Sequence, residues 1–145
     1  MNICLLGNNL TNLLLGSILT KKKINVDIIY QPTKFELKNT VRTIAISNDN
    51  YNFLRENLKG FKNLGWPTEK IKIYSEKNKS TELFEFKNKN QNNFYLFKYI
   101  EIYNLLKKNK LINFIRLKTY NFDIIKKKNY NLIVNSDHNN PITKK

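Results

Sequence analysis

The pattern of apolar and polar positions in the first thirty residues predicts a strand, a helix and a second strand. Residues 2–6 form a short apolar run that Gly7 ends. The next apolar residues recur three and four positions apart, the period of an α-helix: Leu10, Leu13, Leu14 and Ile18. Lysines 21–23 close this helix, where its dipole favours cations. Residues 26–30 are again apolar apart from Asp27. The pattern therefore predicts a βαβ unit with a right-handed crossover.

The rest of the pattern predicts a second helix, a hairpin and further strands. Ser47 or Asn48 would cap a helix that runs past Leu54 and stops at Gly60. Residues 31–40 read as a loop. Further along we expect a turn at 65–67, a hairpin between Ile71 and Phe86, a loop at 87–93, a helix over 99–108 and strands over 112–115, 122–125 and 130–134.

Together these elements predict an α/β fold with a Rossmann-like βαβ core, a parallel sheet and an inserted β-hairpin. The chain has 145 residues, of which 41% are hydrophobic, so it can bury a core as one domain. We therefore expect a single domain over 1–145, with the hairpin inserted at 68–98.

The net charge of +15 raises the question of nucleic-acid binding, but only three of the 26 basic residues are arginines. Arginine makes the bidentate contacts to guanine and phosphate, so nucleic-acid binding is not expected. The single cysteine, Cys4, excludes a disulfide within the chain and suits a reducing cytosol. No apolar run approaches the roughly 18 residues of a membrane span, and the start does not read as a signal peptide. These features predict a cytoplasmic protein, whose basic surface allows peripheral contact with anionic lipid at the inner face of the cell membrane.

The turn after the first strand is the first candidate site. Doubly wound folds bind a dinucleotide at such a turn, with the fingerprint G-x-G-x-x-G. Residues 7–12 keep only Gly7, because Asn9 and Asn12 stand where the other two glycines are expected. Tyr30 replaces the acidic residue expected at the end of the second strand. These residues alone leave two interpretations open: a dinucleotide site, or a structural βαβ unit without a ligand.

The last strand supplies the second candidate. It runs into Asn135-Ser136-Asp137, which can place Asp137 at the carboxyl edge of a parallel sheet. Ligands of open α/β sheets bind along that edge. The alternative is that Asp137 caps a helix beyond this segment.

Three landmarks occur in a familiar order: Ile-Cys-Leu-Leu-Gly at 3–7, Arg-Thr-Ile-Ala-Ile-Ser at 42–47, and Tyr-Asn-Leu-Ile-Val-Asn-Ser-Asp at 130–137. With them the chain resembles the N-terminal part of the FAD-dependent aromatic hydroxylases, most closely the ubiquinone-biosynthesis branch. The last motif departs from the family pattern, since His138, Pro141 and Lys144 stand for its glycine, serine and arginine. In the first motif, Asn9 and Asn12 stand where the family pattern has glycines.

The resemblance implies roles for particular residues. Arg42 would face the flavin or its phosphates, although a surface pair with Glu36 is the alternative. Ser47 reads as a helix cap, Gly16 as a helix-packing residue, and His138 as incidental. No catalytic residue and no metal ligand is identified. The residues implied to bind FAD are Gly7, Asn8, Asn9, Leu10, Asn12, Arg42 and Asp137.

The resemblance also implies a function. The chain would be the FAD-binding part of a monooxygenase that uses NAD(P)H and O2 to hydroxylate a prenylated phenol in ubiquinone biosynthesis. The alternative is a non-catalytic Rossmann-like domain that has lost its cofactor and serves as an interaction subunit.

Overall fold

The structure of the chain, a computed structural model, describes residues 1–32, 42–76, 81–87, 94–120, 122–137 and 140. Contacts divide the chain into two compact units. The first, here called the parallel-sheet unit, comprises 1–39 and 103–145; the second, the inserted unit, comprises 40–102. The insertion that we expect at 68–98 falls within the second unit.

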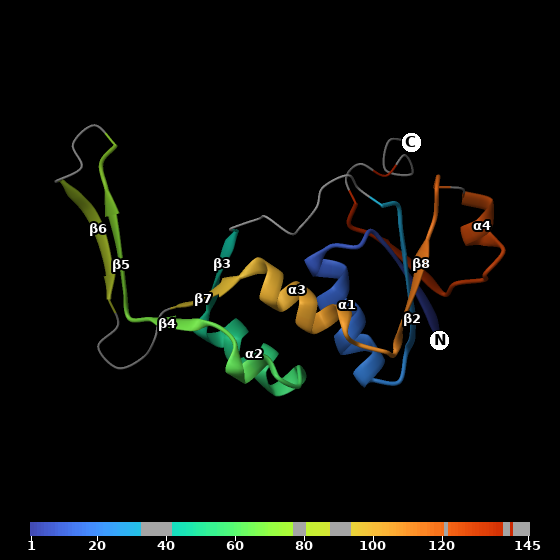
Figure 1. The fold of residues 1–145 in the computed structure, drawn as a ribbon, viewed down its shortest axis with the longest axis horizontal. Coiled ribbons are helices and arrows are strands. Elements are labelled where there is room, and N and C mark those ends of the chain that lie inside the picture. Colours follow the sequence, from blue (N-terminus) through green and yellow to red (C-terminus); the bar gives the residue numbers. More distant parts are fainter. Residues whose placement is uncertain (33–41, 77–80, 88–93, 121, 138–139, 141–145) are drawn as a thin grey trace. The chain divides into compact units, whose positions relative to one another are not determined.

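The parallel-sheet unit is built on four strands, β1 (Asn2–Leu6), β2 (Asn25–Tyr30), β8 (Ile112–Arg116) and β9 (Leu132–Asn135), in the order β8-β2-β1-β9 (Figure 1). Every neighbouring pair in this sheet is parallel. Helix α1 (Leu10–Lys21) connects β1 to β2. The predicted βαβ unit and the α/β fold class are therefore confirmed.

Both faces of this sheet bury apolar side chains, as a parallel sheet requires. On one face, α1 approaches closely because Gly16 has no side chain: a Cβ there would lie 3.1 Å from Cδ1 of Ile112 and 3.4 Å from Cγ1 of Val26. The packing role predicted for Gly16 is thus confirmed. A separate buried cluster comprises Cys4, Leu6, Ile29 and Ile125.

The strand predicted over 122–125 is wrong, because this segment forms the short helix α4 (Phe122–Lys126). A short apolar run does not by itself distinguish a strand from a helix. Asp123 in the first turn and Lys126 in the last favour the helix through its dipole. Ile125 joins the buried cluster, so tertiary packing supports the same outcome.

In the inserted unit, β3 (Thr43–Ser47), β7 (Phe94–Lys98) and β4 (Trp66–Thr68) form an antiparallel sheet in the order β3-β7-β4. Helix α2 (Asn48–Asn57) follows β3, and the oxygen of the Ser47 side chain accepts the N–H of Asn50, so the predicted cap is confirmed. A 3-10 turn spans Phe61–Asn63.

Two strands of this unit differ from what the sequence predicts. The turn predicted at 65–67 is wrong for its last two residues, because 66–68 pair with β7 as strand β4. Strand β7 itself was not expected, because its apolar residues run without a break into the helical stripe of α3 (Tyr99–Lys107). Cross-strand and aromatic packing decides its conformation: Phe97 is fully buried, and the ring of Tyr95 stacks on that of Tyr51 at 3.6 Å.

The predicted hairpin is confirmed as β5 (Lys70–Tyr74) and β6 (Glu82–Lys87), which pair antiparallel. The predicted helix over 99–108 is confirmed as α3, and the predicted strand over 112–115 as β8. Among the described residues, no helix has both the length and the apolar character needed to cross a bilayer. The loop expected at 31–40 lies largely outside the described residues.

Gly16→Val tests the close approach of α1 to the sheet. The larger side chain would overlap Ile112 and Val26, and overpacking of this kind costs about 1–3 kcal/mol. Denaturant unfolding should show this loss of stability. The control Thr11→Val places the same side chain at an exposed position of the same helix and should change stability by no more than about 0.5 kcal/mol. Equal stability of the two variants would contradict this account of the helix packing.

Candidate functional site

The carboxyl ends of β1 and β9 meet at the point where the strand order of the sheet reverses. Gly7 follows β1 and Asp137 follows β9. A Cβ on Gly7 would lie 2.9 Å from Cβ of Asp137, and Gly7 has φ +105°, which favours glycine. The structure thus brings these two predicted residues together at the edge where doubly wound sheets bind ligands.

Asn9 bridges the start of α1 to the end of β9. Its Oδ1 accepts the N–H of Asn12 at 3.0 Å and so caps the helix. Its Nδ2 donates to Ser136 Oγ at 2.8 Å and to the Ser136 carbonyl at 3.2 Å. We call the contacts between these two residues the Asn9–Ser136 bridge. It lies across the switch point of the sheet.

Asn12 stands where the fingerprint has its third glycine, and its side chain points into the turn. Its side chain is fully buried, and its Nδ2 donates to the carbonyls of Leu6 and Gly7, both at 2.8 Å. These two hydrogen bonds orient Nδ2 of Asn12 toward the backbone of the turn. Oδ1 of Asn12 is buried and has no hydrogen-bond partner among the described residues. A buried acceptor without a donor costs free energy, so this oxygen is a local cost of placing asparagine in the turn.

Hydrogen bonds to Tyr120 and Asn135 help to orient Asp137. Tyr120 donates its hydroxyl to Oδ2 of Asp137 at 3.2 Å, and the backbone N–H of Asp137 donates to Oδ1 of Asn135 at 3.0 Å. Burial, together with the nearby Asp137 carboxylate, raises the pKa of Tyr120 to about 12. Tyr120 therefore remains a protonated donor at neutral pH and holds the carboxylate at the sheet edge.

The other predicted residues are placed as follows. Nδ2 of Asn8, which follows Gly7, donates to the Tyr103 hydroxyl at 2.8 Å. Leu10 opens α1. Arg42 belongs to the inserted unit, where its guanidinium lies 5.4 Å from the ring centroid of Tyr99. Glu36 and His138 lie outside the described residues.

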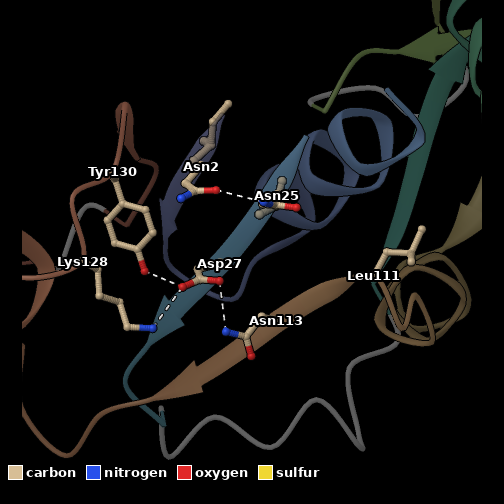
Figure 2. Close-up of a pocket in the computed structure, with 9 residues that line it drawn as sticks. Asn2, Asn25, Asp27, Leu111, Asn113, Lys128 and Tyr130 are labelled. Atoms are coloured by element: carbon tan, nitrogen blue, oxygen red, sulfur yellow. Dashed lines mark hydrogen bonds and ion pairs between the residues drawn. The ribbon is translucent and has the colours of Figure 1, made fainter. Parts of the chain in front are cut away.

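A second polar feature is a cavity of about 510 Å³ in the parallel-sheet unit, lined in part by Asp27, Asn113, Lys128 and Tyr130 (Figure 2). Asp27 of β2 accepts hydrogen bonds from Asn113 at 3.0 Å, from Lys128 at 3.2 Å and from the Tyr130 hydroxyl. Burial raises the pKa of Asp27, but these three donors outweigh it, and the pKa is lowered overall.

This network ties β2 to β8 and to the segment before β9. Because three donors already engage its carboxylate, we interpret Asp27 as structural rather than catalytic. Burial, and after it the Asp27 charge, raises the pKa of the Cys4 thiol to about 12, so Cys4 stays protonated and unreactive. Sequence reasoning did not identify this network, although an aspartate inside an apolar strand signals that partners are needed.

Tyr120 and Ser136 were also not identified as site residues. Their contacts with Asp137 and Asn9 join positions 17 and 127 residues apart in the chain. Tyr120 belongs to no motif, and Ser136 lies in the 130–137 landmark, which assigns it no role, so only the fold reveals these contacts.

Several solved structures share this fold. They include 2,6-dihydroxypyridine-3-hydroxylase from Arthrobacter nicotinovorans, with TM-score 0.53 and 14% identity over 78% of this chain and 28% of that chain. p-Nitrophenol 4-monooxygenase PnpA from Pseudomonas putida DLL-E4 has TM-score 0.59 and 12% identity over 79% and 31%. Klebsiella pneumoniae HpxO, solved in complex with FAD and uric acid, has TM-score 0.56 and 10% identity over 79% and 30%.

At these identities the similarity establishes the fold alone: an α/β fold like that of the FAD-binding region of these enzymes. The chain spans less than a third of the length of each of these three proteins. No family model and no curated protein sequence matches the chain.

Tyr130→Phe tests the Asp27 network. The variant loses a hydrogen bond to a partly buried carboxylate and should be less stable by about 1 kcal/mol at pH 7. The pKa of Asp27 is lowered on folding. The stabilisation that the ionised carboxylate gives the folded state is therefore present above its ordinary pKa of 3.8, and it is lost as pH falls through the lower pKa of the folded state. Unfolding curves of the two proteins should therefore converge below that pH. Tyr74→Phe, at an exposed tyrosine of the hairpin, is the control. A stability difference that persists in acid would contradict the assignment.

Proposed function

We propose that the parallel-sheet unit is the dinucleotide-binding part of a flavin-dependent monooxygenase, with FAD as the dinucleotide. One observation carries the proposal. Gly7, the start of α1 and Asp137 converge at the switch point of a parallel sheet, where doubly wound folds bind dinucleotides.

The start of α1 would bind the diphosphate. The first amides of a helix have no partner within it, and the helix dipole favours an anion there. Asn9 already caps the amide of Asn12, which leaves those of Leu10 and Thr11 to a ligand. Asp137, held by Tyr120, would accept hydrogen bonds from ligand hydroxyls.

The two asparagines are compatible with this role. Nδ2 of Asn9 is a hydrogen-bond donor, so it can exchange Ser136 for a phosphate oxygen. The side chain of Asn12 points into the turn, where it bonds to Leu6 and Gly7. Bound FAD, reduced by NAD(P)H, would supply the chemistry that activates O2 for ring hydroxylation. The chain's own residues would bind and orient the cofactor.

The proposed substrate is a prenylated phenol of ubiquinone biosynthesis. The three landmarks at 3–7, 42–47 and 130–137 support that branch of the hydroxylases. A net charge of +15 supports peripheral contact with anionic lipid, where such a substrate resides.

A second candidate is a domain that has kept the fold, lost the cofactor and acts as an interaction subunit. It is favoured by the Asn9–Ser136 bridge, which uses polar groups at the switch point for an internal contact. The two candidates differ in one measurable property, the binding of FAD.

Titration of FAD with the purified chain tests the proposal, with flavin fluorescence as the readout. We expect saturable binding, and Asp137→Asn should weaken it at least about tenfold, since a hydrogen bond to a charged acceptor is worth about 1.5–3 kcal/mol. Asp49→Asn, at an exposed aspartate on α2, should bind like the parent chain. Fluorescence that stays unchanged with excess protein would reject FAD binding and favour the interaction subunit.

Asn9→Gly tests whether the bridge competes with the diphosphate. Glycine restores the residue of the fingerprint and frees Ser136, while loss of the asparagine cap costs only a few tenths of a kcal/mol. If the diphosphate occupies this place, FAD affinity should rise severalfold in the same titration. Asn57→Gly, at the end of α2, is the control. An unchanged or reduced affinity in Asn9→Gly would place the ligand away from the bridge.

A further inference from the structure

Lys107, the last residue of α3, holds its ammonium group among three aromatic rings of the parallel-sheet unit. Its Nζ is 5.5 Å from the ring centroid of Tyr30, 5.4 Å from that of Tyr103 and 5.5 Å from that of Phe114. Tyr30 ends β2, and Phe114 lies on the neighbouring strand β8. The negative faces of these rings favour a cation beside the carboxyl end of β2.

One hydroxyl connects this ammonium group to the turn after β1. Nζ of Lys107 donates to the Tyr103 hydroxyl at 3.2 Å, and Nδ2 of Asn8 donates to the same oxygen at 2.8 Å. Asn8 directly follows Gly7 in the turn that leads into α1. The positive charge of Lys107 therefore lies close to the turn at which the proposed function places the diphosphate.

Hydrogen bonds also attach the segment after α3 to α1. Nδ2 of Asn109 donates to Oγ1 of Thr20 at 3.1 Å and to Oγ of Ser17 at 3.4 Å. Both acceptors belong to buried residues of α1. Lys107 precedes Asn109 by two positions, so its backbone is held against the helix whose start would bind the diphosphate.

The turn itself carries no cation, because residues 7–12 include no lysine or arginine. It can offer a diphosphate only amide groups and the helix dipole. An ammonium group has three N–H donors, and the contact with Tyr103 engages one of them. Lys107 is exposed, so a ligand at this edge can reach its ammonium group.

We infer that Lys107 pairs with the diphosphate of the bound cofactor and supplies the positive charge that the turn lacks. The inference rests on the proposed function, since it takes FAD to bind at the carboxyl edge. The ammonium group would donate to a phosphate oxygen as a point charge. The three rings and the Tyr103 hydroxyl hold it in place before the ligand arrives, which reduces the entropy lost on binding.

Calorimetric titration of the intact chain with ADP and with adenosine tests the inference, because the two probes differ only in the diphosphate. ADP is also the part of FAD that would lie at this edge. Lys107→Gln should weaken ADP binding at least about tenfold, since charge-assisted hydrogen bonds to phosphate are lost. Adenosine binding should not change. Lys107→Met, which keeps an apolar chain among the rings, should lose ADP affinity to the same extent.

Lys108→Gln is the matched control, because it removes the same charge from the next position, which is also exposed. A net charge of +15 attracts any anion to the surface, so only a difference between the two glutamine variants identifies a specific pair. Lys108→Gln should therefore bind ADP like the parent chain. Circular dichroism of each variant shows whether a lost affinity reflects a lost fold.

The outcomes separate this inference from the proposal on which it rests. If ADP and FAD bind and Lys107→Gln keeps the affinity of Lys108→Gln, the role of Lys107 is wrong and the dinucleotide site stands. If neither ADP nor FAD binds the parent chain, both are overturned. If Lys107→Gln weakens adenosine binding as much as ADP binding, the ammonium group supports the site without contacting the diphosphate, and the inference fails.

Discussion

The parallel pairing of β1 with both β2 and β9 is the constraint on which the candidate site depends. Because parallel strands end at one edge, the residues that follow β1 and β9 meet there although 130 positions separate Gly7 from Asp137. That pairing requires apolar cover on both faces. Gly16 lets α1 approach one of them, and the Asn113–Asp27–Tyr130 contacts join β2 to β8 and to the segment before β9. The placement of Gly7 and Asp137 at the edge thus depends on the packing of the middle of the sheet.

The turn after β1 shows how a glycine-rich motif can be replaced while its backbone path is kept. Gly7 retains the positive φ, which few other residues tolerate. Asn12 turns its amide inward and satisfies the carbonyls of Leu6 and Gly7, so its bulk is accommodated within the turn. Asn9 instead spans the switch point to reach Ser136. The two substitutions therefore differ in consequence: one supports the turn, and the other uses the same surface that a ligand would need.

The sequence predicted the elements whose period is strong and local. The βαβ unit, the Ser47 cap and the hairpin follow from spacing and capping within a few residues, and the structure confirms them. It did not predict α4, because a short apolar run fits both a helix and a strand until Ile125 finds the buried cluster. The meeting of Gly7 and Asp137 follows from the parallel sheet, whereas the contacts of Tyr120 and Ser136 depend on side-chain geometry that no local pattern encodes. The flavin-facing role of Arg42 stays a prediction.

The two polar regions of the parallel-sheet unit differ in how their buried groups are satisfied. At Asp27, a carboxylate in a sheet otherwise rich in apolar residues receives three donors, so this region is complete as it stands. At the carboxyl edge, Oδ1 of Asn8 and Oδ1 of Asn12 are buried and have no hydrogen-bond partner among the described residues. Unpaired buried polar atoms are costly, and a fold retains them where water or a ligand completes them. The Asp27 contacts therefore join neighbouring elements of the unit, whereas the asparagines after β1 leave two buried oxygens without a donor among the described residues.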